Sequence, residues 1–128
     1  MNSAVKDEPF DGRLATFSDE EAEYLAENVL GRLATVSQGG QPHVVPVAFR
    51  FDGTEISFGG WNLRRSLKFR NLAANSKVAF VVDDVVSTRP WKVRGVEVRG
   101  VARPFEVQGG APMVRIRPEV VRSWGLEE

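Results

Sequence analysis

The segment "WNLRRSLKFRNLAANSKVAFVVDD" (61–84) concentrates positive charge in a chain whose formal net charge is zero. It is entered through "FGGWN" (58–62), where two glycines lead from an expected strand into an expected helix. Unpaired N–H groups at a helix start, the Ser66 hydroxyl and nearby cations can together hold a phosphate. The cations are Arg64, Arg65, Lys68 and Arg70. The spacing is not that of a P-loop, and a solvated charged helix face is the alternative interpretation.

A second candidate is the strand-like run "GQPHVVPVAF" (40–49), which contains a proline. Proline cannot donate to a β-ladder, so Pro46 indicates a sheet edge or a bulge. Such an edge would leave backbone groups near Val45 and Val47 free to hydrogen-bond a planar ring. His43 is the only histidine, and we interpret it as a strand residue in preference to a catalytic base.

The aromatic candidates are Trp61, Trp91 and Trp124. Core or interface packing explains each of them taken alone. Trp124 is the best functional candidate because it lies in a short polar tail, and a tryptophan there could stack on a tricyclic ring and exclude water. We find no Ser/His/Asp arrangement, and we interpret Asp83 and Asp84 as turn residues at the end of a strand.

Composition excludes several other classes of protein. Lys plus Arg equals Asp plus Glu at 17 each, whereas a general nucleic-acid binder carries a basic excess. The absence of cysteine excludes disulfides and thiolate chemistry, and one histidine cannot build a multi-histidine metal site. No apolar run is long enough to span a membrane, and the polar first residues show no signal core. The expectation is a soluble cytoplasmic protein.

The elements that must position these residues predict a mainly β fold. We expect a flexible leader over 1–16 and a single domain over 17–128. A capping box at Ser18 and Glu21 predicts a helix that runs to about Val29 and stops at Gly31. A second helix is expected over 62–75, with Leu63, Leu67 and Ala74 on one face, and the tail from residue 119 is expected to be a short helix or turn. Strands are expected at 32–37, 43–51, 54–58, 77–84, 91–107 and 113–118.

The arrangement of these strands favours a small barrel. The first three form an antiparallel meander, because Asp52-Gly53 is a strong hairpin signal. "VSTRP" (86–90) is expected to be a loop. Gly95 and Gly100 interrupt a long alternating strand, as bulges in a curved sheet do. The expected architecture is therefore a closed or split β-barrel with two or three short helices.

The order of several patterns resembles the pyridoxamine 5'-phosphate oxidase-like (PPOX-class) split β-barrel proteins, which are of the FMN-binding type. These patterns are "GRLATVSQGGQPHVVPVAF", "SLKFRNLAANSKVAFVVDD", "VRGVEVRGVARPF" and "VRIRPEVVRSWGL". The chain looks most similar to the branch that uses the deazaflavin coenzyme F-420. The resemblance implies a homodimer with two cofactor sites at the subunit interface.

The resemblance also implies roles for particular residues. The ring would be contacted by His43, Val44, Val45, Pro46 and Val47, and the phosphate by Trp61, Asn62, Ser66 and Lys68. Arg94 of the partner subunit and Trp124 would lie near the ring. Leu67 replaces the arginine of the oxidase's Arg-Lys pair, and the oxidase's basic C-terminal region is absent, so pyridoxine phosphate oxidation is not favoured. Arg64, Arg65 and Arg70 are inferred to hold the acidic tail of F-420.

Three functions follow as hypotheses. The first is an F-420-dependent oxidoreductase that transfers a hydride to an electron-poor small molecule such as an enone or conjugated imine, with a proton supplied by a backbone N–H or by water. The second keeps the fold and replaces F-420 by FMN. The third is a non-catalytic protein that binds a cofactor or haem, with His43 as a weak candidate ligand.

Overall fold

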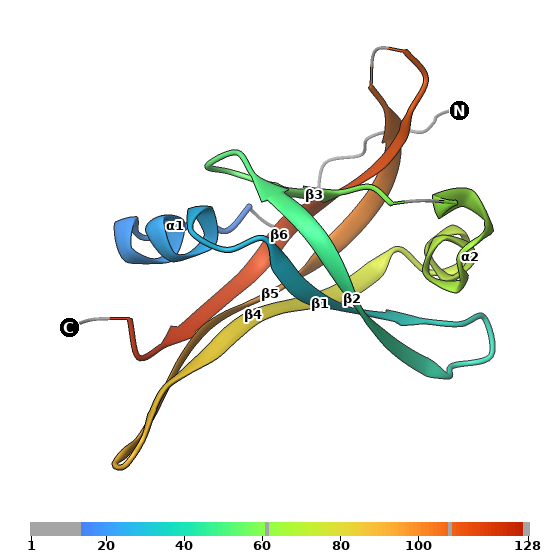
Figure 1. Cartoon of the computed structure of the whole chain (residues 1–128). Helices are drawn as coiled ribbons and strands as arrows, with labels where there is room; N and C mark the ends of the chain where they lie inside the picture. The colour runs from blue at the N-terminus through green and yellow to red at the C-terminus, as the bar shows by residue number, and fades with distance from the viewer. Residues whose placement is uncertain (1–13, 61, 108, 127–128) are drawn as a thin grey trace.

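The computed structural model describes residues 14–60, 62–107 and 109–126 (Figure 1). It contains two α-helices, one 3-10 turn and six strands within these residues. The helical elements are α1 (Asp19–Ala26), η1 (Leu63–Arg65) and α2 (Leu67–Ala74). The strands are β1 (Leu30–Val36), β2 (Pro42–Phe51), β3 (Ile56–Phe58), β4 (Lys77–Thr88), β5 (Trp91–Glu106) and β6 (Pro112–Trp124).

The strands form a closed antiparallel barrel in the order β1-β2-β3-β6-β5-β4, and β4 pairs back onto β1. This confirms the mainly β class, the split-barrel fold and the meander of the first three strands. The interior is filled by alternate side chains of the strands, as a barrel wall requires. The largest fully buried ones include Leu33, Ile56, Phe58, Phe80 and Ile116.

The capping box of α1 is confirmed. The backbone N–H of Ser18 donates to Glu21 Oε1 at 2.9 Å, and the N–H of Glu21 donates to Ser18 Oγ at 3.1 Å. The predicted helix end was wrong, because α1 ends at Ala26 and Gly31 lies inside β1. A Cβ at Gly31 would lie 2.3 Å from a ring atom of Phe80. Glycine is therefore needed there to make room for an aromatic ring of the neighbouring strand β4 and not as a helix stop.

The strand ends of β4 and β6 also differ from prediction. The "VSTRP" segment is mostly strand, since β4 continues to Thr88, and the two strands β4 and β5 extend together as a long hairpin (Figure 1). The predicted C-terminal helix or turn is instead the second half of β6. A register shift between Arg99 and Gly100 places Pro118 opposite Gly100 and leaves Glu119 without a partner on β5. The bulge allows β6 to continue past Pro118, a residue that from the sequence alone indicates the end of a strand.

The second helix is divided. Ser66 has an extended backbone between η1 and α2, so the helix begins at Leu67. The predicted apolar face is only partly confirmed: Leu63 is buried, but Leu67 is 42% exposed and Ala74 is exposed. Asn71 and Leu72 are buried instead. The buried Asn71 amide donates to Thr35 Oγ1 of β1 at 3.0 Å. This bond fixes α2 to the barrel wall beside the first half of β2.

The predicted leader is described only from residue 14 onwards. The N–H of Ala15 donates to the carbonyl of Pro118 at 3.1 Å, and the Phe17 ring packs edge-on against Phe51. Contact with the barrel thus begins before residue 17. Among the described residues, no helix has the length and hydropathy needed to cross a membrane.

Candidate cofactor and substrate site

The first half of β2 is an open sheet edge. β2 pairs with β1 along Pro42–Ala48, but β3 pairs only with Phe49, Arg50 and Phe51. In the described chain the segment 42–48 therefore has a strand on one side only, which confirms the edge predicted from Pro46.

The direction of the backbone groups on this edge follows from one bond. The N–H of Phe49 donates to the carbonyl of Val29 on the β1 side at 3.0 Å. Because backbone groups alternate along a strand, those of Val45 and Val47 also face β1. The N–H groups on the open edge are those of Val44 and Ala48. The nitrogen of Pro46 lies between them on the open edge. No neighbouring strand there would accept a hydrogen bond, so the missing N–H of proline loses none.

The predicted ring-binding side chains fall on two faces of β2. Val47 is buried and Val45 half-buried, whereas Val44 is 66% exposed and Pro46 is exposed. His43 is half-buried opposite Thr35, and its Nδ1 atom is buried without a hydrogen-bond partner in the described structure. A buried nitrogen of this kind is costly unless a ligand or water satisfies it.

The segment 62–66 turns the chain from β3 into α2. Asn62 is exposed and adopts a left-handed conformation with φ of 60°. The Ser66 hydroxyl accepts from the N–H of Phe69 at 3.2 Å and donates to the carbonyl of Leu63 at 2.7 Å. Ser66 therefore serves as the N-cap of α2. The prediction for Trp61 lies outside the described residues.

Replacing Ser66 with alanine is expected to lower the free energy of unfolding by about 1 kcal/mol, because the cap of α2 is lost. The measurement is the urea midpoint at constant m-value. Ser66→Asn, which can cap equally well, should retain most of the stability. Equal losses in the two variants would show that the cap is not the reason.

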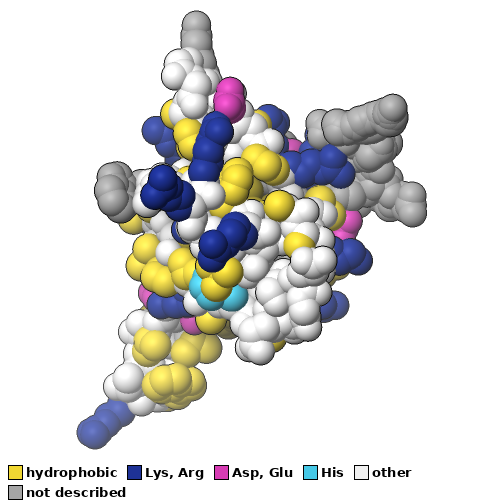
Figure 2. Space-filling view, turned by 90° about the vertical axis from the view of Figure 1, so that its right-hand side faces the viewer, with side chains coloured by type: hydrophobic (Ala, Val, Ile, Leu, Met, Phe, Trp, Pro, Cys, Tyr) yellow, Lys and Arg dark blue, Asp and Glu magenta, His cyan; other side chains and the backbone are white. Residues whose placement is uncertain are grey.

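The four cations of this segment are not equivalent. Arg64 Nη2 lies 2.7 Å from Glu106 Oε2, and both side chains are more than half exposed. Arg65, Lys68 and Arg70 have no ion-pair partner among the described residues; Lys68 is half-buried and the other two are exposed. Figure 2 shows Lys and Arg side chains gathered on the face that also carries the single histidine. Three cations thus remain available to an anionic ligand.

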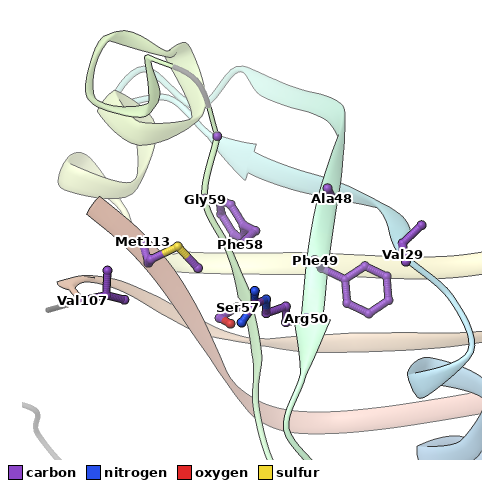
Figure 3. Close-up of a pocket in the computed structure, with 10 residues that line it drawn as sticks. Val29, Ala48, Phe49, Arg50, Ser57, Phe58, Gly59, Val107 and Met113 are labelled. Carbon is purple, nitrogen blue, oxygen red and sulfur yellow. The ribbon is translucent and has the colours of Figure 1, made fainter. Parts of the chain in front are cut away.

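A groove lies beside the paired end of β2 and β3. Its volume is about 770 Å³, which is within the usual range for small-molecule sites. Most of its wall is apolar, and Arg50 and Ser57, which are register partners, form its polar part (Figure 3). The lining residues are Val29, Ala48, Phe49, Arg50, Ser57, Phe58, Gly59, Gly60, Val107 and Met113.

Sequence reasoning missed this groove. The available signal was the alternation of "VAFRF" (47–51), which places Ala48 and Arg50 on the outward face next to the predicted ring-binding residues. Val107 and Met113 come from the other end of the chain, and only the barrel closure through β3 and β6 brings them here.

Arg94 and Trp124 lie elsewhere in the chain's fold. They occupy the end of the β5–β6 pair that points away from α2 (Figure 1). Arg94 binds Asp84 through two hydrogen bonds of 2.9 and 3.3 Å, so Asp84 is a strand residue in an ion pair and the prediction of a turn there was wrong. Trp124 is opposite Gly95, where a Cβ would lie 2.5 Å from its ring. One chain alone does not bring Arg94 and Trp124 to the open edge of β2.

Asp84 also accepts a hydrogen bond from the Tyr24 hydroxyl at 2.6 Å. The Arg94 and Tyr24 hydrogen bonds favour the ionised carboxylate and hold the pKa of Asp84 below its usual value of 3.8. Burial, followed by the Asp84 hydrogen bond, raises the pKa of Tyr24. The Arg94 guanidinium lies 5.1 Å from the centre of the Tyr24 ring, and the three side chains join α1 to the β4–β5 hairpin.

The pH dependence of stability should report this network. A carboxylate with a depressed folded pKa stabilises the folded chain above about pH 4, and the contribution is lost as pH falls through that folded pKa. The melting temperature of Asp84→Asn should therefore lie below that of the wild type at pH 6, and the gap should narrow below pH 4. Asp83→Asn, which removes the half-exposed pair with Arg32, should have a smaller effect. A gap for Asp84→Asn that is independent of pH would contradict this assignment.

The barrel, its open edge and the basic turn define a class of protein. Residues 17–124 match the pyridoxamine 5'-phosphate oxidase family, and the chain belongs to that family. The resemblance stated from the sequence is thereby confirmed.

One relative is the 5a,11a-dehydrotetracycline/5a,11a-dehydrooxytetracycline reductase of Streptomyces rimosus, which is 43% identical over 121 residues covering 87% of this chain and 84% of the relative. Among solved structures, an F-420 reductase is 26% identical with a TM-score of 0.61, covering 78% of this chain and 94% of its own. The FAD binding protein from Mycobacterium smegmatis is 23% identical with a TM-score of 0.66, covering 86% and 96%. Family and relatives together make this protein an oxidoreductase.

Proposed function

We propose that the protein is an F-420-dependent reductase that transfers a hydride to an electron-poor carbon–carbon double bond of a small molecule. The relative at 43% identity is named for two dehydro compounds, and a solved structure at 26% identity is an F-420 reductase. The observation that carries the choice of F-420 is a group of three cations beside the open edge of β2, Arg65, Lys68 and Arg70, for which the described residues offer no ion-pair partner. The single phosphate of FMN needs fewer cations than the phosphate and the acidic tail of F-420 together, so three cations favour F-420.

The residues present fit such a cofactor. The N–H groups of Val44 and Ala48 and the unpartnered Nδ1 of His43 offer hydrogen bonds to a planar ring and its side chain. Lys68 and the N-terminal turn of α2 offer a binding site for a phosphate. When bound, the reduced cofactor supplies the hydride. The chain supplies the orientation of the ring against the groove, a largely apolar wall that limits water, and fixed charge.

FMN is the second candidate, because the same edge and the same phosphate seat serve a flavin. A neighbour in fold is an FAD binding protein. FMN ends at its phosphate and has no group that would bind Arg65 and Arg70. The acidic tail of F-420 would bind both. These two arginines therefore distinguish the cofactors.

We also propose that two copies assemble around the sites. The outward face around the free half of β2 carries exposed apolar side chains, among them Leu30 at 52% and Val44 at 66%. Val85, Val86 and Trp91 on the β4–β5 hairpin are likewise more than half exposed. A partner's hairpin on this face would bring its Arg94 towards the open edge of β2. Light scattering should then give about twice 14.2 kDa, and a monomer at micromolar concentration would contradict the assembly.

The test of function is a parallel titration with F-420 and FMN, followed by the shift in melting temperature and by turnover of an enone with reduced F-420. We expect a larger shift with F-420 and turnover with the reduced form. Arg65→Gln with Arg70→Gln should weaken F-420 and leave FMN unchanged. Tight FMN binding with no response to F-420 would overturn the choice of cofactor.

A further inference from the structure

The groove between β2, β3 and β6 carries one unexplained charge. Arg50 is the only charged side chain among the described lining residues, and it has no ion-pair or hydrogen-bond partner in the described structure. Ser57, its register partner on β3, is the only hydroxyl in that lining. Figure 3 shows both side chains between the strands, with Phe58 and Met113 nearby.

Two glutamates at the ends of neighbouring strands, Glu55 before β3 and Glu106 at the end of β5, are already engaged. Glu55 lies 3.7 Å from Arg115 and 3.3 Å from Arg117, and Glu106 pairs with Arg64. Arg50 therefore has no ion-pair partner in the part of the chain that the structure describes. Many surface arginines are simply solvated, but this one borders an apolar groove, where charge is less screened than in open water.

The proposed reaction creates a negative charge that needs a partner. A hydride added to the β carbon of an enone breaks the C=C π bond and moves its electron pair towards the carbonyl oxygen, which gives an enolate. The hydride donor, a reduced deazaflavin or flavin, is oxidised by two electrons. Water then protonates the α carbon and regains the proton that the oxidised donor releases, so the substrate gains two hydrogens and the oxygen becomes neutral.

We propose, resting on the function proposed above, that Arg50 binds the carbonyl oxygen of the substrate and stabilises the enolate that forms on it. Ser57 adds a second donor from the opposite strand. Fixed donors aimed at a developing oxyanion act most strongly in the transition state. The apolar wall and the single cation together fit an apolar, fused-ring enone whose carbonyl oxygen gains the negative charge of the enolate.

The experiment compares Arg50→Gln and Arg50→Lys with the wild type in full-length protein. The control is Lys77→Gln, which removes an exposed cation at the start of β4, outside the groove. The first measurement is the melting shift on adding oxidised F-420 or FMN, which we expect to be unchanged in all variants. The second is the single-turnover rate of enone reduction, which we expect to fall about 100-fold or more in Arg50→Gln and less in Arg50→Lys.

A third measurement needs no turnover. Binding of a fused-ring phenolate and of its neutral methyl ether is followed by fluorescence across the phenol's own pKa. The wild type and Lys77→Gln should prefer the phenolate by at least tenfold, and Arg50→Gln should lose that preference. If Arg50→Gln binds cofactor normally, reduces the enone within threefold of the wild type and keeps the preference, the role of Arg50 is overturned and the proposed function stands. If the wild type binds neither cofactor, the proposed function and the role of Arg50 are both overturned.

Discussion

Replacing Lys68 with glutamine is expected to weaken cofactor binding at least tenfold. Lys68 is half-buried near the start of α2 and has no ion-pair partner in the described structure. A hydrogen bond to a charged group contributes about 1.5–3 kcal/mol, and the loss applies to any cofactor with a phosphate in this seat. Isothermal titration with F-420 and with FMN measures it directly.

The matched comparison is Arg64→Gln on the same segment. Arg64 is already paired with Glu106 at 2.7 Å, so its removal also frees an acid and should affect binding less than removal of Lys68. Lys77→Gln, which removes an exposed cation at the start of β4, controls for net charge. Equal, small losses in the Lys68 and Lys77 variants would mean that the anion is held elsewhere.

The second large effect concerns stability. Gly100→Ala is expected to lower the free energy of unfolding by about 3 kcal/mol, at the upper end of overpacking costs. A Cβ at this position would lie 2.0 Å from the carbonyl oxygen of Arg117, a backbone atom that cannot rotate away. The strain falls on the bulge that carries Pro118 along β6.

Gly39→Ala provides the control for a glycine in open space, since a Cβ there meets nothing closer than 4.0 Å. Its urea midpoint should match the wild type within error. A Gly100→Ala variant as stable as the wild type would show that the bulge between β5 and β6 can move to accept a side chain, which would contradict this prediction.

Local signals in the sequence predicted much of this fold. The capping box at Ser18, the Asp52-Gly53 hairpin and the alternation of Val96 and Val98 each depend on neighbours a few residues away. Such features are visible in one chain without knowledge of its partners. The barrel followed from their number and order.

The errors have a common physical origin in long-range contacts. Gly31 looked like a helix stop because nothing in the sequence shows the Phe80 ring lying 2.3 Å from its missing Cβ. The second half of β6 was not predicted because Pro118 indicates a strand end, and the bulge opposite Gly100 that accommodates it forms only when β5 and β6 pair. Asp84 looked like a turn residue because its partners, Tyr24 and Arg94, come from two other elements.

The site was predictable in part for the same reason. Pro46 indicates an edge through its own chemistry, and the density of cations from Arg64 to Arg70 is local. The groove around Arg50 was not predictable, since Val107 and Met113 reach it only through the closure of the barrel. Whether Arg94 and Trp124 join the site depends on a second copy of the chain, which no pattern in one sequence can show.

The central claim is that the redox ring lies along the open edge of β2 while its phosphate is held at the start of α2. Amide chemical shifts measured during a cofactor titration test this most directly. We predict that the largest changes occur at the N–H groups of Val44 and Ala48 and in the first turn of α2, with saturation at one cofactor per chain. Saturable binding that leaves the amides of β2 and α2 unchanged would contradict the account.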